Sequence, residues 1–167
     1  GESKEVKITL NNLTYGQATV FVEGNKTKIE NITFAITDNA MNIMKNASSA
    51  QSVLKVSDGT PDINMIDKVE LKNVKVIGGE KGIDIHGVTN AIIDKVVVTT
   101  PEKLGMSVTS SNATITNSNI EAGTWAGIGI MEVKSTAPSA YQGYSVVRVG
   151  NGNTIPSMYA ETPNIGN

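Results

Sequence analysis

The residues best suited to acid–base chemistry are Asp84 and His86, the latter being the chain's single histidine. They lie in the segment GIDIH (82–86), where they alternate with Ile83 and Ile85. A β-strand would therefore place Asp84 and His86 side by side on one face. Such a pair can transfer a proton or bind a metal ion. Asp94, a few residues further on, is the third candidate for a catalytic group.

The surroundings of this pair favour a simpler interpretation. In the neighbouring repeats described below, the equivalent positions hold Ser107 with Thr109 and Gly127 with Gly129, and no second histidine, lysine or arginine completes a site. We therefore expect a solvated strand face, with no metal site and no cofactor. The chain contains no cysteine, which also excludes disulfides and thiolate metal sites.

Aromatic side chains offer a second kind of chemistry, because exposed rings can stack on sugars. Trp125 stands in the glycine-containing segment AGTWAG (122–127), and Tyr141 and Tyr144 follow it. These three residues are the candidates for ligand binding. For Trp125 a second role stays open, since a large ring could instead cover the end of a hydrophobic core.

An internal repeat indicates which elements position these residues. The segments LKNVKV (71–76), IDKVVV (93–98) and ITNSNI (115–120) begin at a constant interval. Two earlier segments, IENITF (29–34) and LNNLTY (10–15), resemble them. Aligning these two segments places Asn12–Tyr15 beside Asn31–Phe34. We also expect Asn90 and Asn112, which are separated by the same interval, to form a polar ladder at a turn.

Each repeat carries a second strand-like segment. These segments are ATVFV (18–22), GIDIH (82–86), GMSVT (105–109) and GIGIM (127–131). A period of about 22 residues with two or more short strands predicts stacked coils, in which equivalent residues lie about 4.8 Å apart. A β-sandwich would also give short strands, but not a constant register of this length.

Two regions depart from this period. The interval from Ile29 to Leu71 is close to two periods, and we expect an irregular coil there, with a strand at 53–56 and one or two helical turns within 39–51. We place the β-helix domain at 1–150, with coils over about 6–133 and a cap or last strand at about 134–150. Residues 151–167 are expected to form an extended tail.

The repeated coils resemble those of right-handed parallel β-helix proteins, typified by pectin lyases and many bacterial surface proteins. The resemblance covers roughly residues 6–133. It implies an all-β, single-stranded right-handed parallel β-helix of about five to six coils with an irregular C-terminal cap. Lyases of that family use several aspartates, Ca²⁺ and an arginine or lysine base. Here the one arginine, Arg148, lies beyond the regular coils and the acidic cluster is missing, so no catalytic residue is carried over.

Composition narrows the function. The net charge is −2 and aromatic residues make up 4% of the chain, which argues against binding nucleic acid. No apolar run approaches the roughly 18 residues of a membrane span, so we expect no membrane insertion. The leading hypothesis is a non-catalytic structural or adhesive module, secreted or at a bacterial cell surface. It would contact polysaccharide or other surface components, as a monomer or as part of a longer chain. A polysaccharide lyase or glycosidase of the same fold is the alternative.

Overall fold

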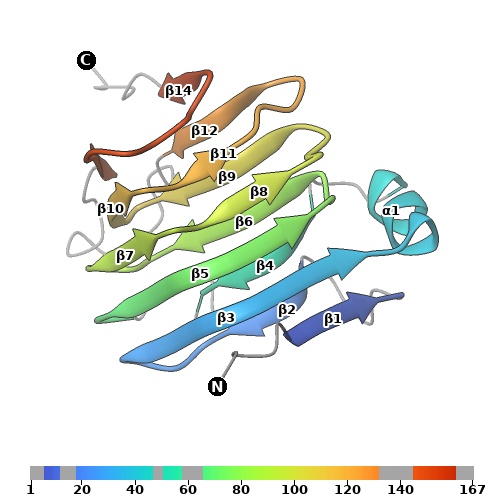
Figure 1. The fold of residues 1–167 in the computed structure, drawn as a ribbon, viewed down its shortest axis with the longest axis horizontal. Helices are drawn as coiled ribbons and strands as arrows, with labels where there is room; N and C mark the ends of the chain where they lie inside the picture. Colours follow the sequence, from blue (N-terminus) through green and yellow to red (C-terminus); the bar gives the residue numbers. More distant parts are fainter. Residues whose placement is uncertain (1–5, 12–17, 47–50, 58–65, 132–144, 161–167) are drawn as a thin grey trace, which may run out of the picture.

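The computed structural model describes residues 6–11, 18–46, 51–57, 66–131 and 145–160. In these ranges the chain winds into a solenoid of stacked coils whose strands form two parallel sheets (Figure 1). Sheet A contains β1 (Val6–Leu10), β3 (Thr27–Ile36), β5 (Val69–Ile77), β7 (Ala91–Asp94), β8 (Val97–Thr99), β10 (Asn112–Thr116), β11 (Asn119–Ile120) and β13 (Val146–Val149). Sheet B contains β2 (Ala18–Val22), β4 (Ser52–Val56), β6 (Lys81–His86), β9 (Leu104–Thr109), β12 (Ala126–Met131) and β14 (Met158–Ala160).

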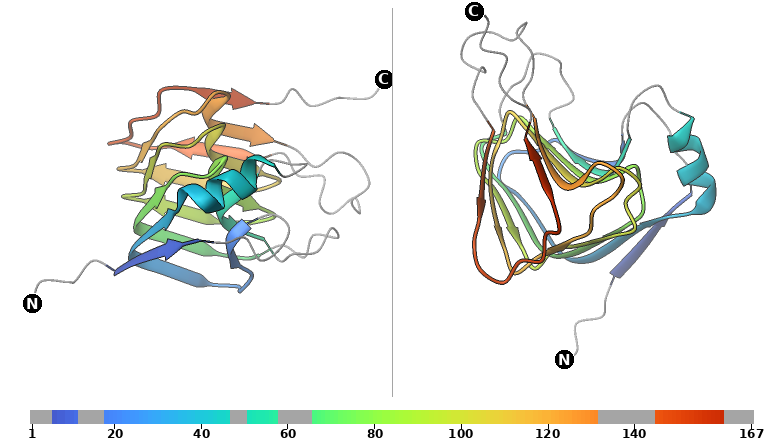
Figure 2. Two further views of the ribbon diagram at one scale, coloured as in Figure 1. Left: turned by 90° about the vertical axis from the view of Figure 1, so that its right-hand side faces the viewer. Right: turned by 90° about the horizontal axis from the view of Figure 1, so that it is seen from above.

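The register between coils confirms the internal repeat. In sheet A, Leu71 pairs with Ile93 and Ile93 pairs with Ile115. Seen along the stacking direction, the central coils lie over one another (Figure 2). The all-β parallel solenoid expected from the sequence is therefore the fold of this chain.

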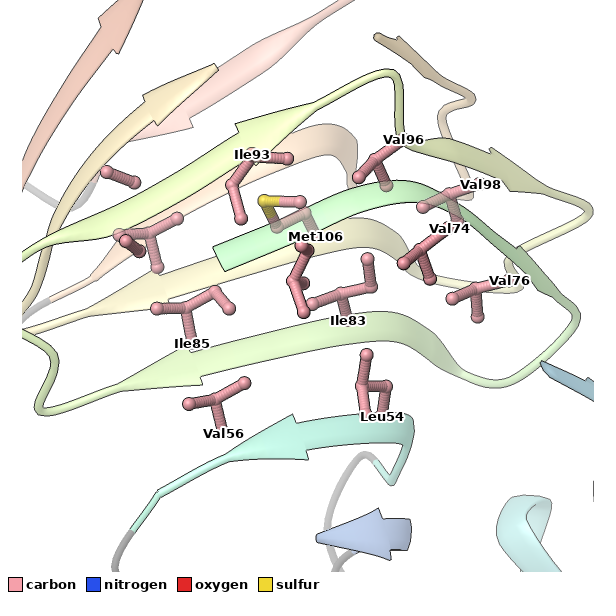
Figure 3. Packing of buried hydrophobic residues seen from close by; sticks show 14 of the residues in the cluster. Leu54, Val56, Val74, Val76, Ile83, Ile85, Ile93, Val96, Val98 and Met106 are labelled. Atoms are coloured by element: carbon pink, nitrogen blue, oxygen red, sulfur yellow. The ribbon is translucent and has the colours of Figure 1, made fainter. Parts of the chain in front are cut away.

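The hydrophobic core lies between the two sheets. Ile83 and Met106 of sheet B face Ile93 of sheet A across the interior, and all three side chains are fully buried (Figure 3). Each such side chain contributes about 1.5–3 kcal/mol by leaving water. Because a single coil could not enclose these residues, stacking of neighbouring coils is what holds the fold together.

The interval from Ile29 to Leu71 is one enlarged coil, not two, because these two residues pair directly. The extra residues include a helix, α1 (Asp38–Lys45), which lies beside the stack (Figure 1). The Thr37 side chain caps α1 by accepting a hydrogen bond from Ala40 N, and Met44 is buried against the core. No helix in the described ranges is long and apolar enough to cross a bilayer.

The expected alignment at the N-terminus is wrong. Residues 12–15 lie outside the described ranges, and the strand beside β3 is β1, which pairs Val6 with Ile32 and Ile8 with Phe34. Polar and apolar residues alternate in VKITL as well as in LNNLTY, so either segment could pair with β3. The short similarity between 12–15 and 31–34 therefore did not determine the register of the first strand against β3.

The polar ladder forms at another position. Equivalent places in successive coils are occupied by Asn31, Asn73, Lys95 and Asn117, and all four have positive φ angles between 50° and 56°. Asn73 Nδ2 donates to Asn31 Oδ1 at 2.8 Å. Asparagine tolerates this left-handed conformation better than most residues, which explains its recurrence. Asn90 and Asn112 are exposed, and their side chains form no hydrogen bond within the described residues.

The last coil extends further than expected. β13 lies in the segment expected to form a cap or last strand, and pairs with β10. β14 lies in the segment expected to form an extended tail, yet it pairs in parallel with β12. Sheet B is therefore continued by residues 158–160.

Candidate functional site

One line of outward-facing residues crosses all six strands of sheet B. Backbone pairing aligns them in the order Phe21, Lys55, Asp84, Ser107, Gly129 and Tyr159, and we call this line the outer row. Their strand neighbours Leu54, Ile83, Met106 and Ile128 point into the core. The outer row places charged and aromatic groups from distant parts of the sequence on one face of the sheet.

Asp84 is the centre of a charged cluster in the outer row. Its side chain accepts a hydrogen bond from Ser107 Oγ at 2.6 Å on Oδ1. Its other oxygen, Oδ2, lies 3.9 Å from Lys55 Nζ and 3.8 Å from Lys81 Nζ. Asp84 is only 6% exposed and Lys55 only 7%. The expected solvated strand face without a neighbouring cation is therefore wrong.

The repeat did not predict that Lys55 lies next to Asp84, because the pairing of β4 with β6 is offset by more than the regular period. Burial lowers the pKa of Lys55 below its usual 10.5, while the Asp84 carboxylate raises it and Lys81 lowers it further. A lysine with a lowered pKa has a larger neutral fraction near neutral pH, and a neutral amine can accept a proton.

The structure separates the three candidate catalytic residues. His86 lies on the same strand face as Asp84, as the alternation predicted, and pairs in register with Thr109. Asp94 lies in β7 of sheet A, on the other side of the core, so it cannot act together with them. Its Oδ1 accepts hydrogen bonds from Thr116 Oγ1 and Asn117 Nδ2, both at 2.8 Å. These bonds lower the pKa of Asp94 and give it a structural role at the turn.

Towards the C-terminal end of the outer row lies a surface hollow, which we call the aromatic depression. It has a volume of about 350 Å³ and is lined by Leu104, Trp125, Met131 and Tyr159. The Trp125 and Tyr159 side chains are 57% and 53% exposed, so both rings are open to a ligand. The interpretation of Trp125 as a cover for the core is therefore wrong.

Gly129 keeps the aromatic depression open. A Cβ atom at this position would lie 3.0 Å from Met131 Cε and 3.1 Å from Leu104 Cδ1. The residue therefore sits directly between the apolar side chains that line the hollow, where a larger side chain would fill it.

The Trp125 ring contacts a lysine that pairs with a buried carboxylate. The Lys103 ammonium lies 5.4 Å from the centroid of the Trp125 ring, within the range of a cation–π contact. The same ammonium forms an ion pair with the buried carboxylate of Glu80. Glu80 also accepts a hydrogen bond from Gln51 N at 2.8 Å. This chain of contacts restricts the orientation of an otherwise exposed ring.

Sequence reasoning missed Tyr159, because the pairing of β14 with β12 is also offset by more than the regular period and no repeat marks it. Tyr141 and Tyr144, the other two candidates for ligand binding, lie outside the described residues. Among the residues that are described, no group of three or more histidines, aspartates or glutamates is arranged to hold a metal ion.

Part of the chain matches a known protein family. Residues 62–137 match the family model described as the right-handed β-helix region. This match and the parallel solenoid of the structure together support a right-handed β-helix repeat in that part of the chain. No curated protein and no solved structure matches it. The stacked coils thus provide the scaffold, and the charged cluster and the aromatic depression lie at and beside the outer row of sheet B.

Proposed function

We propose that this β-helix is a non-catalytic structural or adhesive module, secreted or at a bacterial cell surface, that binds polysaccharide or related surface components in the aromatic depression. The observation that carries the proposal is the pair of exposed rings, Trp125 and Tyr159, beside one apolar hollow. Monomeric proteins usually keep large aromatic side chains mostly buried, so two exposed rings at one hollow point to a ligand.

The chemistry of the aromatic depression fits a sugar. The C–H face of a sugar ring packs against an aromatic side chain, and its hydroxyl groups need polar partners at the edge of the contact. Leu104 and Met131 supply apolar lining, while Lys103 next to Trp125 supplies a hydrogen-bond donor.

Substitution of Trp125 tests the proposal. The protein would be mixed with a panel of bacterial, plant and host polysaccharides, and co-elution would be followed by size-exclusion chromatography. Since Trp125 is the chain's only tryptophan, its fluorescence reports directly on the depression. We expect Trp125→Ala to weaken binding at least tenfold without lowering the melting temperature.

Phe21→Ala is the matched control, because Phe21 is an exposed aromatic residue at the opposite end of the outer row. It should leave the affinity within twofold of the wild-type value. Equal loss in both variants, or a panel in which no polysaccharide co-elutes or changes the fluorescence, would argue against sugar binding at Trp125.

A second candidate function is a polysaccharide lyase or glycosidase, and the charged cluster is the observation that favours it. Lys55 with its lowered pKa, next to Asp84 and on the same sheet face as His86, offers a group that could accept a proton. The same chromatography tests this alternative, because an enzyme would shorten the polymer. Shortening that persists through purification and disappears in a folded Lys55→Met or His86→Ala variant would replace the binding module with an enzyme.

A further inference from the structure

A second hollow lies on sheet A, on the opposite side of the core from the outer row. It has a volume of about 340 Å³, and its lining includes Asn31, Thr33, Asn73, Lys75, Lys95 and Val97. These residues belong to three neighbouring coils, through β3, β5 and the β7–β8 segment, which lie side by side in sheet A (Figure 1). The hollow that they line therefore crosses the stack as a groove. We call it the basic groove.

The charges around the basic groove are unevenly distributed. Two lysines line it and no carboxylate does, although the whole chain has a net charge of −2. Within the part of the chain that the structure describes, neither Lys75 nor Lys95 forms an ion pair. Lys7 stands next to Thr33 in the register of β1 and β3, which adds a further cation to the same row.

The acidic groups of this sheet face compensate only part of its positive charge. Glu30 pairs with Lys28 at 2.9 Å, and Glu70 forms an ion pair with Lys68. Asp94 stays ionised, because its partners Thr116 and Asn117 are neutral donors, and it offsets part of the charge of the neighbouring Lys95. The basic groove therefore keeps an excess of positive charge.

The groove also offers neutral hydrogen-bond donors. The hydrogen bond from Asn73 Nδ2 to Asn31 Oδ1 uses the oxygen of Asn31 as the acceptor. The Asn31 Nδ2 hydrogens therefore remain as donors. Ammonium and amide N–H groups around one hollow are the donor set that oxyanions require, because oxyanion oxygens only accept hydrogen bonds.

We propose that the basic groove binds an oxyanion group of an anionic ligand, held between Lys75 and Lys95. The carboxylate of an acidic sugar, a sulfate ester and a phosphate ester share this chemistry. The site is independent of the aromatic depression, since it lies on the other sheet and uses none of the same residues. Binding there weakens as salt concentration rises, because exposed charges are screened.

The test is an NMR titration at constant ionic strength with four probes: inorganic sulfate, inorganic phosphate, a uronic acid monosaccharide and the corresponding neutral hexose. At least one oxyanion is expected to shift the signals of Asn31, Asn73, Lys75 and Lys95 saturably, while the neutral hexose shifts none of them. The probe that binds best distinguishes a tetrahedral ester group from a carboxylate.

The variant is Lys75→Gln combined with Lys95→Asn, which removes both charges and keeps at position 95 a residue suited to its φ of 55°. It should weaken binding at least tenfold. Lys28→Gln is the matched control, because Lys28 lies on the same sheet but already pairs with Glu30; it should change the affinity less than twofold. An equal effect of the control, saturable shifts by the neutral hexose, or no saturable shift with any oxyanion would overturn the proposal.

Discussion

Asp94 illustrates how a single carboxylate stabilises the solenoid. It accepts hydrogen bonds from Asn117 Nδ2 and Thr116 Oγ1 of the next coil, and these bonds hold its pKa below the usual 3.8. Because the folded-state pKa is depressed, this contribution to stability is complete above pH 3.8. It is lost as the pH falls through the folded-state pKa.

Removal of the Asn117 amide should raise the pKa of Asp94 towards 3.8. Asn117→Gly is the suitable change, since the backbone there has a φ of 50°, which glycine adopts without strain. A ¹³C NMR titration of the Asp94 carboxyl carbon measures the effect. Asn90→Gly is the control, because the Asn90 side chain forms no hydrogen bond within the described residues. An unchanged Asp94 pKa in Asn117→Gly would refute the assigned role of the Asn117 bond.

Residue alternation predicted part of the candidate site. It placed Asp84 and His86 on one face and Ile83 and Ile85 on the other, and the structure agrees. It could not predict that Asp84 would be buried next to Lys55, because the offset between β4 and β6 depends on an insertion that follows no repeat. Local pattern determines which way a side chain points, whereas its neighbours depend on register between coils.

At the scale of elements, three glycines mark the entry to the sheet B strands. Gly82, Gly105 and Gly127 occupy equivalent positions in β6, β9 and β12. A Cβ at Gly105 would lie 2.4 Å from Glu121 O and 2.8 Å from Gly127 O. Both of these atoms belong to the backbone, so no side-chain rotation could relieve the contact.

Gly105→Ala should therefore lower the free energy of unfolding by about 2 kcal/mol or more, as overpacking does at rigid sites. Urea denaturation measures this change. Gly24→Ala provides the comparison, because a Cβ there would meet only the Thr27 hydroxyl, at 3.0 Å, and moving that hydroxyl breaks no more than its exposed hydrogen bond to Gly24 O. Similar losses of stability in the two variants would show that the close approach of neighbouring backbone at Gly105 is not the reason that position 105 requires a glycine.

Sequence periodicity predicted the regular elements well and the irregular ones poorly. The segments 71–76, 93–98 and 115–120 stack as expected because each coil repeats the same inward residues. The sequence did not predict the single enlarged coil that contains α1, or the strand β14. Residues inserted at a turn lengthen the interval between two paired strands but leave no mark in the sequence of either strand. The repeat is a property of the stacked strands and not of the turns.

At the scale of the whole molecule, the two ends of the core differ from its middle. Val6 and Ile8 face inward at one end, and Val149 and Met158 occupy inward positions at the other, yet all four are more than a third exposed. The central coils carry side chains such as Ile83 that are fully buried. A terminal coil has one neighbour and a central coil has two, so opening the end of the stack loses about half as many contacts.

Hydrogen exchange should therefore show a gradient of protection along the stack. The hydrogen-bonded amides of β6 and β9 should exchange only by global unfolding, with an exchange free energy equal to the value from urea denaturation. Those of β1 and β14 should exchange faster through local opening of the end coils. A destabilising core substitution in a central coil, Ile85→Ala, should lower the protection of β6 and β9 by the full change in stability and affect β14 less. Uniform protection from β1 to β14 would instead mean that the solenoid opens as one indivisible unit.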